Sequence, residues 1–428
     1  DLEMLDFGAG SAAWAAGFEY MSTAYSVQVD AQREAGNVMG SAGSSSRGYR
    51  DIRAQYLELS VPLTDWAELN IATRHDDYSD FGSTDNSKFS LRVQAMDNLV
   101  LRASYAESFI APTLDSLGMS TAFSADSATD YVACLNAGTF GTRNCRSGQK
   151  RVYRLANPDL GPEQGEYTNF GIVYNPIPEM SIVLDMYELK LENQEQLVSA
   201  SDLLLAELAG TLGTIQAVIP SARIDRKPYL AGSSTIDNGS GQCDYGLGLV
   251  PCKGALDYIY APVANFGGFE VSGMDLAIDY TLETERFGTF VPKLDVSIID
   301  EYMAEDYLSG PMVDLVGRNG LPEMRGLLTV NWYKGNFSAY YQIEYIDSMY
   351  ENSSFDLATL SSSASGDLGS HELHNIQFSW DGPTNTTVTL GIRNLEDKEP
   401  ILDSNLGWNS YLYDLYGRTY FARITQRF

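Results

Sequence analysis

Extended segments of alternating polarity follow one another along this chain, joined in turn by tight turns and by long polar loops. In the stretch 89–105, apolar residues occupy every second position on both sides of the turn Met96–Asn98. A period of two is the signature of a strand that separates two environments. Because tight turns join antiparallel neighbours, the pattern predicts an all-β chain built from consecutive hairpins.

The pattern predicts fourteen strands. We place them at 13–29, 50–61, 67–76, 87–95, 99–108, 165–174, 181–192, 269–281, 289–303, 322–332, 337–348, 370–380, 386–393 and 415–428. The two longest connections are 109–164 and 193–268, and the second contains a predicted helix at 199–210.

Two architectures fit such strands. In a soluble β-sandwich the apolar face looks inward onto a dry core, whereas in an outer-membrane barrel it looks outward to lipid. Most of the predicted strands have about 9–14 residues, the length that crosses a bilayer at a tilt. Tight turns and long loops also segregate strictly, as they do between the periplasmic and extracellular rims of a barrel. We therefore predict an antiparallel transmembrane β-barrel with both chain ends on the periplasmic side.

The charge balance excludes some functions. The chain has 28 Lys and Arg against 57 Asp and Glu, a net charge of −29, whereas a nucleic-acid partner requires a basic surface. No apolar run approaches the roughly 20 residues of a membrane helix, so only a barrel can span the membrane. Catalytic motifs such as GxSxG, HExxH and the P-loop are missing from the sequence, and we expect neither enzymatic activity nor a cofactor or metal.

Four cysteines form two close pairs, Cys134 with Cys145 and Cys243 with Cys252. Neither pair has CxxC spacing, and the three histidines lie far away in the sequence, which argues against a zinc site. The spacing favours two local disulfides formed in an oxidising compartment.

The chain ends in a strand pattern. Tyr420, Ala422 and Ile424 alternate with polar residues up to the terminal Phe428, and only Gln426 interrupts the apolar face. This ending resembles the signal that outer-membrane proteins present to their insertion machinery. We predict that these four residues form a C-terminal assembly signal at the periplasmic rim.

Four segments closely resemble landmarks of TonB-dependent outer-membrane receptors and occur in that family's order: His75–Leu117, Asn157–Tyr174, Asn265–Leu282 and Gly391–Pro400. Ile110 stands where the family usually has Arg or Lys. We expect the landmark residues to be structural. The resemblance implies a barrel of 22 strands filled by an N-terminal plug that carries a TonB box.

We therefore expect residues 1–428 to be the C-terminal part of one barrel domain. The plug and the first strands would lie in a missing segment or in a separate N-terminal partner chain. The edge strands 13–29 and 418–428 would then each need a neighbour, because open sheet edges are not tolerated at membrane depth.

The resemblance implies a receptor in the outer membrane of a Gram-negative bacterium, surrounded by lipid. It would bind a scarce nutrient, such as a siderophore, an oligosaccharide or another small molecule, with its extracellular loops and import it through the action of TonB on the plug. The alternative is a porin-like or structural barrel without a plug. Loop aromatics are candidate ligand contacts, unless they belong to an interface girdle or a loop core: Tyr131, Phe140, Tyr245, Tyr350, Trp408, Tyr411 and Tyr413.

Overall fold

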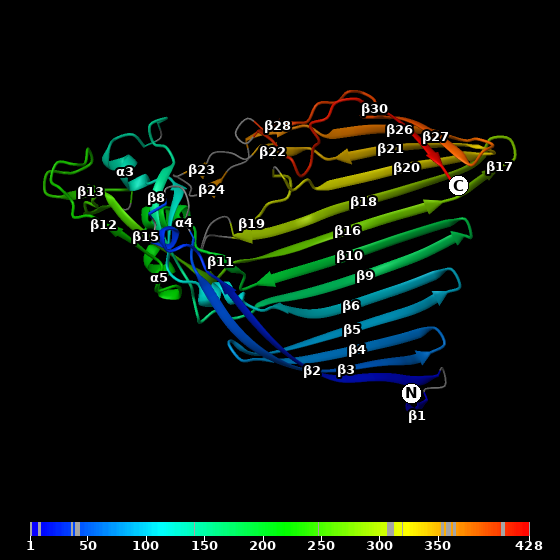
Figure 1. The fold of residues 1–428 in the computed structure, drawn as a ribbon, viewed down its shortest axis with the longest axis horizontal. Helices are drawn as coiled ribbons and strands as arrows, with labels where there is room; N and C mark the ends of the chain where they lie inside the picture. The colour runs from blue at the N-terminus through cyan, green and yellow to red at the C-terminus, as the bar shows by residue number, and fades with distance from the viewer. Residues whose placement is uncertain are drawn as a thin grey trace.

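The computed structural model describes residues 2–6, 10–35, 37–38, 43–140, 142–246, 248–305, 312–318, 320–351, 355–356, 361–362, 365–403 and 407–427. Fourteen long strands form one curved antiparallel sheet, and they confirm all fourteen predicted strands (Figure 1). They are β2 (Ser11–Val27), β3 (Ser46–Thr64), β4 (Ala67–Tyr78), β5 (Gly82–Met96), β6 (Leu99–Ile110), β9 (Glu163–Ile177), β10 (Met180–Glu192), β16 (Gly268–Tyr280), β18 (Gly288–Glu305), β20 (Met324–Lys334), β21 (Phe337–Ile346), β26 (His371–Asp381), β27 (Thr386–Arg393) and β30 (Thr419–Gln426).

Each long strand pairs with the next one in the chain, from β2 to β30. Three short strands extend this sheet: β1 (Leu2–Asp6) on β2, and β17 (Leu282–Thr284) and β19 (Met312–Asp314) on β18. Among the described residues β30 pairs only with β27. The expected 22-stranded barrel, with neighbours for both edge strands, stays a prediction.

The register places apolar residues side by side on one face of the sheet. Val330, Tyr341, Ile376, Ile392 and Tyr420 lie opposite one another across five successive strands. Ile376 and Tyr420 are 40% and 68% exposed, and the other three side chains are half-buried. No soluble core covers such a face, so the band fits the lipid-facing side of an outer-membrane barrel.

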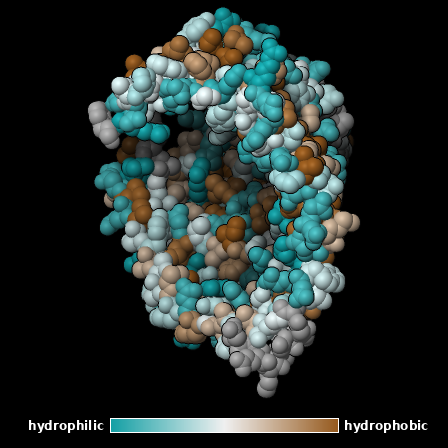
Figure 2. All heavy atoms as spheres, turned by 90° about the vertical axis from the view of Figure 1, so that its right-hand side faces the viewer, coloured by the Kyte–Doolittle hydropathy of each residue, from teal (hydrophilic) through white to brown (hydrophobic). Residues whose placement is uncertain are grey.

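The polar face is turned inward. Asp185, Asp275 and Arg325, from three strands, line one cavity together with Leu412 of the loop after β27. Seen from the short-turn end, the wall surrounds a hollow (Figure 2). The strand termini also fall as predicted, because the tight turns and both chain ends gather at one end of the sheet and the long loops at the other (Figure 1).

The two longest loops fold together into a small domain beyond the strand ends, which we call the cap: the described residues of 111–162 and 193–267 (Figure 1). The first loop contributes α2 (Leu114–Gly118), β7 (Ala122–Ala128), α3 (Tyr131–Asn136) and β8 (Gly148–Leu155). The second contributes β11 (Glu195–Leu197), α4 (Ala200–Ala209), α5 (Leu212–Val218), β12 (Arg223–Arg226), β13 (Gln242–Asp244), β14 (Leu249–Pro251) and β15 (Leu256–Asn265).

A five-stranded sheet joins the two loops, because β8 of the first pairs in parallel with β15 of the second. The predicted helix is α4, which is capped by Ser199 and ends at Gly210, whose φ is +75°. Its apolar run Leu203–Leu205 is buried, and Leu203 and Leu204 pack in one core with Val152 and Ile259 of the sheet. The cap therefore has a hydrophobic core of its own.

The remaining elements lie in shorter connections: α1 (Ala31–Glu34), β22 (Met349–Glu351), β23 (Phe355–Asp356), β24 (Ser361–Ser362), β25 (Ser365–Leu368), β28 (Leu402–Asp403) and β29 (Gly407–Trp408). Within the described ranges, none of the helices has the length and apolarity needed to cross a membrane.

Candidate functional site

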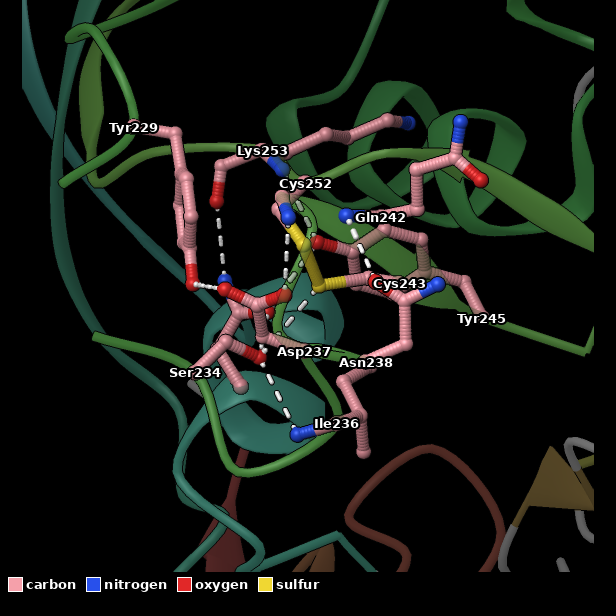
Figure 3. Close-up of a disulfide and its surroundings, with 12 residues drawn as sticks. Tyr229, Ser234, Ile236, Asp237, Asn238, Gln242, Cys243, Tyr245, Cys252 and Lys253 are labelled. Carbon is pink, nitrogen blue, oxygen red and sulfur yellow. Dashed lines mark hydrogen bonds between the residues drawn. A yellow bond between two sulfur atoms is a disulfide. The ribbon is translucent and has the colours of Figure 1, made fainter. Parts of the chain in front are cut away.

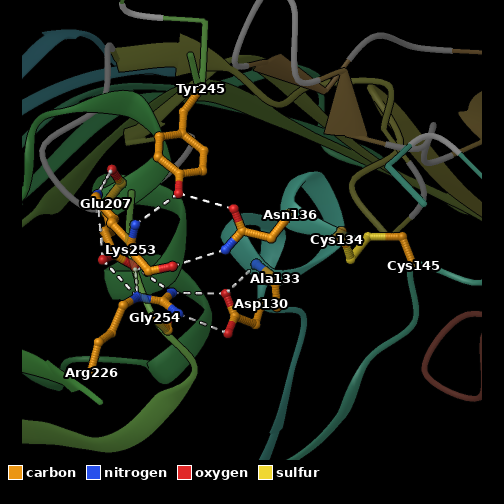
Figure 4. Close-up of polar contacts among 10 residues, drawn as sticks. All are labelled: Asp130, Ala133, Cys134, Asn136, Cys145, Glu207, Arg226, Tyr245, Lys253 and Gly254. Carbon is orange, nitrogen blue, oxygen red and sulfur yellow. Dashed lines mark hydrogen bonds and ion pairs between the residues drawn. A yellow bond between two sulfur atoms is a disulfide. The ribbon is translucent and has the colours of Figure 1, made fainter. Parts of the chain in front are cut away.

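Both predicted disulfides are present, and both lie in the cap. Cys134 at α3 is bonded to Cys145, and Cys243 of β13 is bonded to Cys252 just after β14 (Figures 3 and 4). The second cystine is buried in a core with Val132 of the first loop. Because a cross-link reduces the freedom of a long loop, the two bonds pre-organise the cap.

A buried ion network ties the two loops together. Arg226 lies between Asp130 of the first loop, at 2.8 Å, and Glu207 of α4, at 2.6 Å (Figure 4). All three side chains are less than a tenth exposed. Lys253 reaches the same Glu207 at 3.4 Å. A buried cation with two carboxylate partners holds its loops in one arrangement.

Asn136 adds a second link between the loops. Its side-chain amide donates to the Lys253 carbonyl at 2.9 Å, and its Oδ1 accepts from the Tyr245 hydroxyl at 3.0 Å (Figure 4). The same Oδ1 also accepts from the Ser234 hydroxyl at 2.9 Å. The Tyr245 hydroxyl in turn accepts from the Lys253 amide at 2.9 Å.

Asp237 shapes the turn beside the second disulfide (Figure 3). Its carboxylate accepts from the Tyr229 hydroxyl at 2.7 Å and from the backbone amides of Gly239 and Gly241 at 2.9 and 3.0 Å. The hydrogen bond from Tyr229 lowers the pKa of Asp237. The turn is thus held by an ionised carboxylate at neutral pH.

Several residues of the landmark at 75–117 contact Arg50 of β3. The guanidinium contacts Asp80 at 2.7 Å, donates to the Pro112 carbonyl at 2.7 Å, and lies over the rings of Tyr78 and Phe81. These contacts connect three segments of the extracellular rim, so the landmark residues have a structural role here.

Two further landmarks hold the base of the cap. Glu195 accepts from the Thr113 amide at 2.9 Å and from the Ser116 hydroxyl, which fixes the start of the first loop. Asn265 exchanges hydrogen bonds of 2.8 and 2.9 Å with the backbone of Gly161, which fixes its end. The two loops of the cap are therefore fastened to each other at their base, next to the strand ends from which they leave the barrel.

The predicted ligand-contacting aromatics are not brought to one place. Tyr131 and Tyr245 pack in the disulfide core, and Trp408 and Tyr413 pack in another core with Ile346. Tyr245 and Tyr413 are buried, which favours the loop-core interpretation for these two.

Phe140 is half-buried. Tyr350 and Tyr411 are exposed, by 54% and 94%. For the accessible rings, contact with a ligand stays a prediction.

An aromatic stack on the open face of the cap sheet was missed by the sequence analysis. The rings of Tyr258, Tyr153 and Tyr260 follow one another at 5.1 and 5.3 Å, with Arg151 and Arg223 over the two outer rings. The period of two in "RVYR" and "DYIYAP" is the signal that would have revealed these strands.

The hollow of the barrel contains a cavity of about 680 Å³. Four carboxylates line it, from Asp185, Asp275, Asp295 and Glu344, whereas Arg325 is the one guanidinium among the lining residues and Arg102 pairs with Asp185. Its charge is therefore predominantly negative, as is that of the whole chain.

The C-terminal assembly residues lie on the lipid-facing side of β30. Tyr420 and Ile424 are 68% and 74% exposed, and Ala422 is exposed between them. Phe428 lies outside the described residues. Their part in assembly stays a prediction. In the part of the chain that the structure describes, no three His, Cys, Asp or Glu side chains gather closely enough to hold a metal ion.

The profile of the family described as "TonB dependent receptor-like, beta-barrel" matches residues 3–395. No curated protein sequence matches the chain.

Among solved structures, the siderophore receptor PirA from Acinetobacter baumannii is similar, with a TM-score of 0.61 and 14% identity over 96% of this chain and 52% of that one. A variant of the ferric enterobactin receptor PfeA from Pseudomonas aeruginosa follows, with a TM-score of 0.60 and 14% identity over 98% of this chain and 51% of that one. The chain thus spans about half the length of the solved structures that it matches. It belongs to the TonB-dependent receptor-like β-barrels of the Gram-negative outer membrane, a family of receptors rather than enzymes.

Proposed function

We propose that this protein binds a scarce nutrient outside the cell with its loop cap and imports it across the outer membrane with energy delivered by TonB. The observation that carries this proposal is the cap itself. Two disulfides, the ion network around Arg226 and a shared core hold two loops of different strands in one arrangement at the extracellular rim. A pre-organised surface binds with less loss of conformational entropy than free loops do.

Membership of the family supports the transport part of the proposal. TonB would act through the plug that the sequence resemblance implies. A solved complex of a PfeA variant with enterobactin shows that a barrel of similar fold binds a ligand of that kind.

The test is uptake by living cells that express the complete polypeptide. Radiolabelled ferric siderophores and oligosaccharides would be offered to cells with and without TonB, and with and without an uncoupler of the proton gradient. We expect accumulation of one compound that requires both TonB and the gradient. Uptake that survives loss of both, together with ion conductance in planar bilayers, would instead support the porin-like alternative.

A further inference from the structure

A separate pocket of about 350 Å³ lies where the cap joins the barrel wall. Its residues come from both ends of the second loop, from the start of α4, and from the extracellular ends of β16 and β18. The pocket therefore stands between the cap and the hollow of the barrel.

Two aromatic rings form one wall of this pocket. Phe269 of β16 and Tyr302 of β18 lie nearly parallel, with an angle of 11° and 5.6 Å between ring centres. Because Phe269 pairs with Ala304 and Val271 pairs with Tyr302, both rings are on the same face of the sheet. The two rings stack on each other, and an outer aromatic face of such a pair can pack against the C–H face of a sugar ring.

The other groups in the pocket are hydrogen-bonding but not cationic. The Gln196 amide donates to Gln194 Oε1 at 2.7 Å, which orients both amides, and the carboxyls of Asp202 and Glu305 lie beside them. None of the described lining residues is Lys or Arg. Amides and carboxyls offer paired donors and acceptors that match neighbouring hydroxyl groups. Burial raises the pKa of Asp202, which further lowers the cost of a neutral ligand beside it.

Gly267 keeps the pocket open. A Cβ at this position would lie 3.8 Å from Glu305 Oε2 and 3.9 Å from Gln196 Nε2, so a larger side chain would extend between these polar groups. Its φ of +68° is also a conformation that glycine adopts without strain. The open space, the polar groups and the aromatic wall therefore belong to one pocket.

We propose that this pocket binds one ring of a neutral, hydroxyl-rich ligand, namely a saccharide unit. This proposal rests on the import function proposed above. Anionic ligands are disfavoured by the predominantly negative lining of the cavity in the barrel and find no Lys or Arg among the described residues that line the pocket. The ligand of this receptor is then a neutral oligosaccharide or glycoside.

The test uses the complete polypeptide from outer membranes in a detergent without a sugar headgroup. Maltose, cellobiose and chitobiose would be titrated by calorimetry and by saturation-transfer NMR, with digalacturonate as the anionic counterpart. We expect at least one neutral disaccharide to bind about tenfold more tightly than digalacturonate. Absence of neutral-sugar binding up to roughly 10 mM, or tighter binding of digalacturonate, would overturn the proposal.

Substitutions test whether the disaccharide binds in this pocket. We expect Tyr302→Ala and Gln196→Ala each to weaken the disaccharide by about tenfold or more. Ala304→Trp fills the pocket and leaves every polar group in place, and we expect it to abolish binding. Tyr258→Ala removes a similar ring from the aromatic stack of the cap and should bind normally. Unchanged binding by Ala304→Trp would contradict the site.

Failure of this inference is distinguishable from failure of the proposed import function. TonB-dependent uptake of a ferric siderophore without any sugar binding would reject the saccharide pocket and keep the import function. If the protein binds a sugar in vitro but uptake does not require TonB, the import function is rejected and the saccharide pocket is kept.

Discussion

Gly171 allows the barrel wall to carry an ion pair across an intervening strand. It lies on β9, opposite Arg102 of β6 and Asp185 of β10, and these two side chains meet over it. A Cβ at this position would overlap both charged groups. We expect Gly171→Ala to separate the pair and to lower stability by about 1–3 kcal/mol.

The midpoint of heat-induced unfolding, followed by gel mobility of the detergent-solubilised protein, measures this change. Gly213→Ala is the matched control, because a Cβ there meets nothing within 4 Å and its position is helical. That variant should unfold at or slightly above the wild-type temperature. An equal midpoint for both variants would show that the wall tolerates the extra carbon at Gly171.

Asp237 makes the turn beside the second disulfide sensitive to acid. In the folded protein the Tyr229 hydroxyl lowers the pKa of the Asp237 carboxyl. The carboxylate therefore stabilises the turn fully above its unfolded pKa, and this stabilisation is lost as the pH falls through its folded pKa. We expect the hydrogen-exchange protection of the Gly239 and Gly241 amides, corrected for intrinsic rates, to decrease below about pH 4. Asp237→Asn keeps the acceptor oxygen but does not titrate. Its protection should not depend on pH, and a wild-type profile equally flat would contradict the assignment.

At the scale of elements, Arg226 decides whether the two loops of the cap stay together. Its loss leaves Asp130 buried without a cation and leaves Glu207 with Lys253 alone, and breaking a buried ion pair costs on the order of 3–5 kcal/mol. We therefore expect Arg226→Met to open the cap to limited proteolysis while the barrel strands remain resistant.

The control removes the buried charges with the cation. Asp130→Asn with Glu207→Met in the Arg226→Met background removes all three buried charges and leaves only the partly exposed Lys253 without its partner. Asn still caps α3 as Asp130 does. This triple variant should recover most of the resistance. Equal sensitivity of the single and triple variants would mean that the network acts through its specific hydrogen bonds rather than through charge balance.

The strands of the cap also show where sequence reasoning stops. β8 and β15 have alternating patterns, but each is short and lies inside a long polar loop. The partner of Val152 is Ile259, more than a hundred positions away and in a different loop. No local signal announces such a parallel pairing, whereas α4 is visible from its apolar run and from the capping residues at both ends.

At the scale of the whole molecule, the barrel wall was predictable because every long strand separates lipid from the hollow. The rows that join Leu328 to Ile343 and Val330 to Tyr341 follow directly from period-two patterns and tight turns. The binding groups were not predictable in this way. Phe269 and Tyr302 look like ordinary strand residues, and only the curvature of the wall and the return of the second loop give them a pocket.

The last prediction concerns the edge of β30 that lies away from β27. Its amides that do not bond to β27 have no partner among the described residues, and an unsatisfied backbone group at membrane depth costs several kcal/mol. We expect these amides to be as strongly protected from hydrogen exchange as those of β27 when the complete polypeptide is measured in its outer membrane. That result would mean that a further strand pairs with β30, as barrel closure requires. Rapid exchange of the same amides beside a protected β27 would mean that the edge is open, and the role of a sealed, gated receptor would then have to be abandoned.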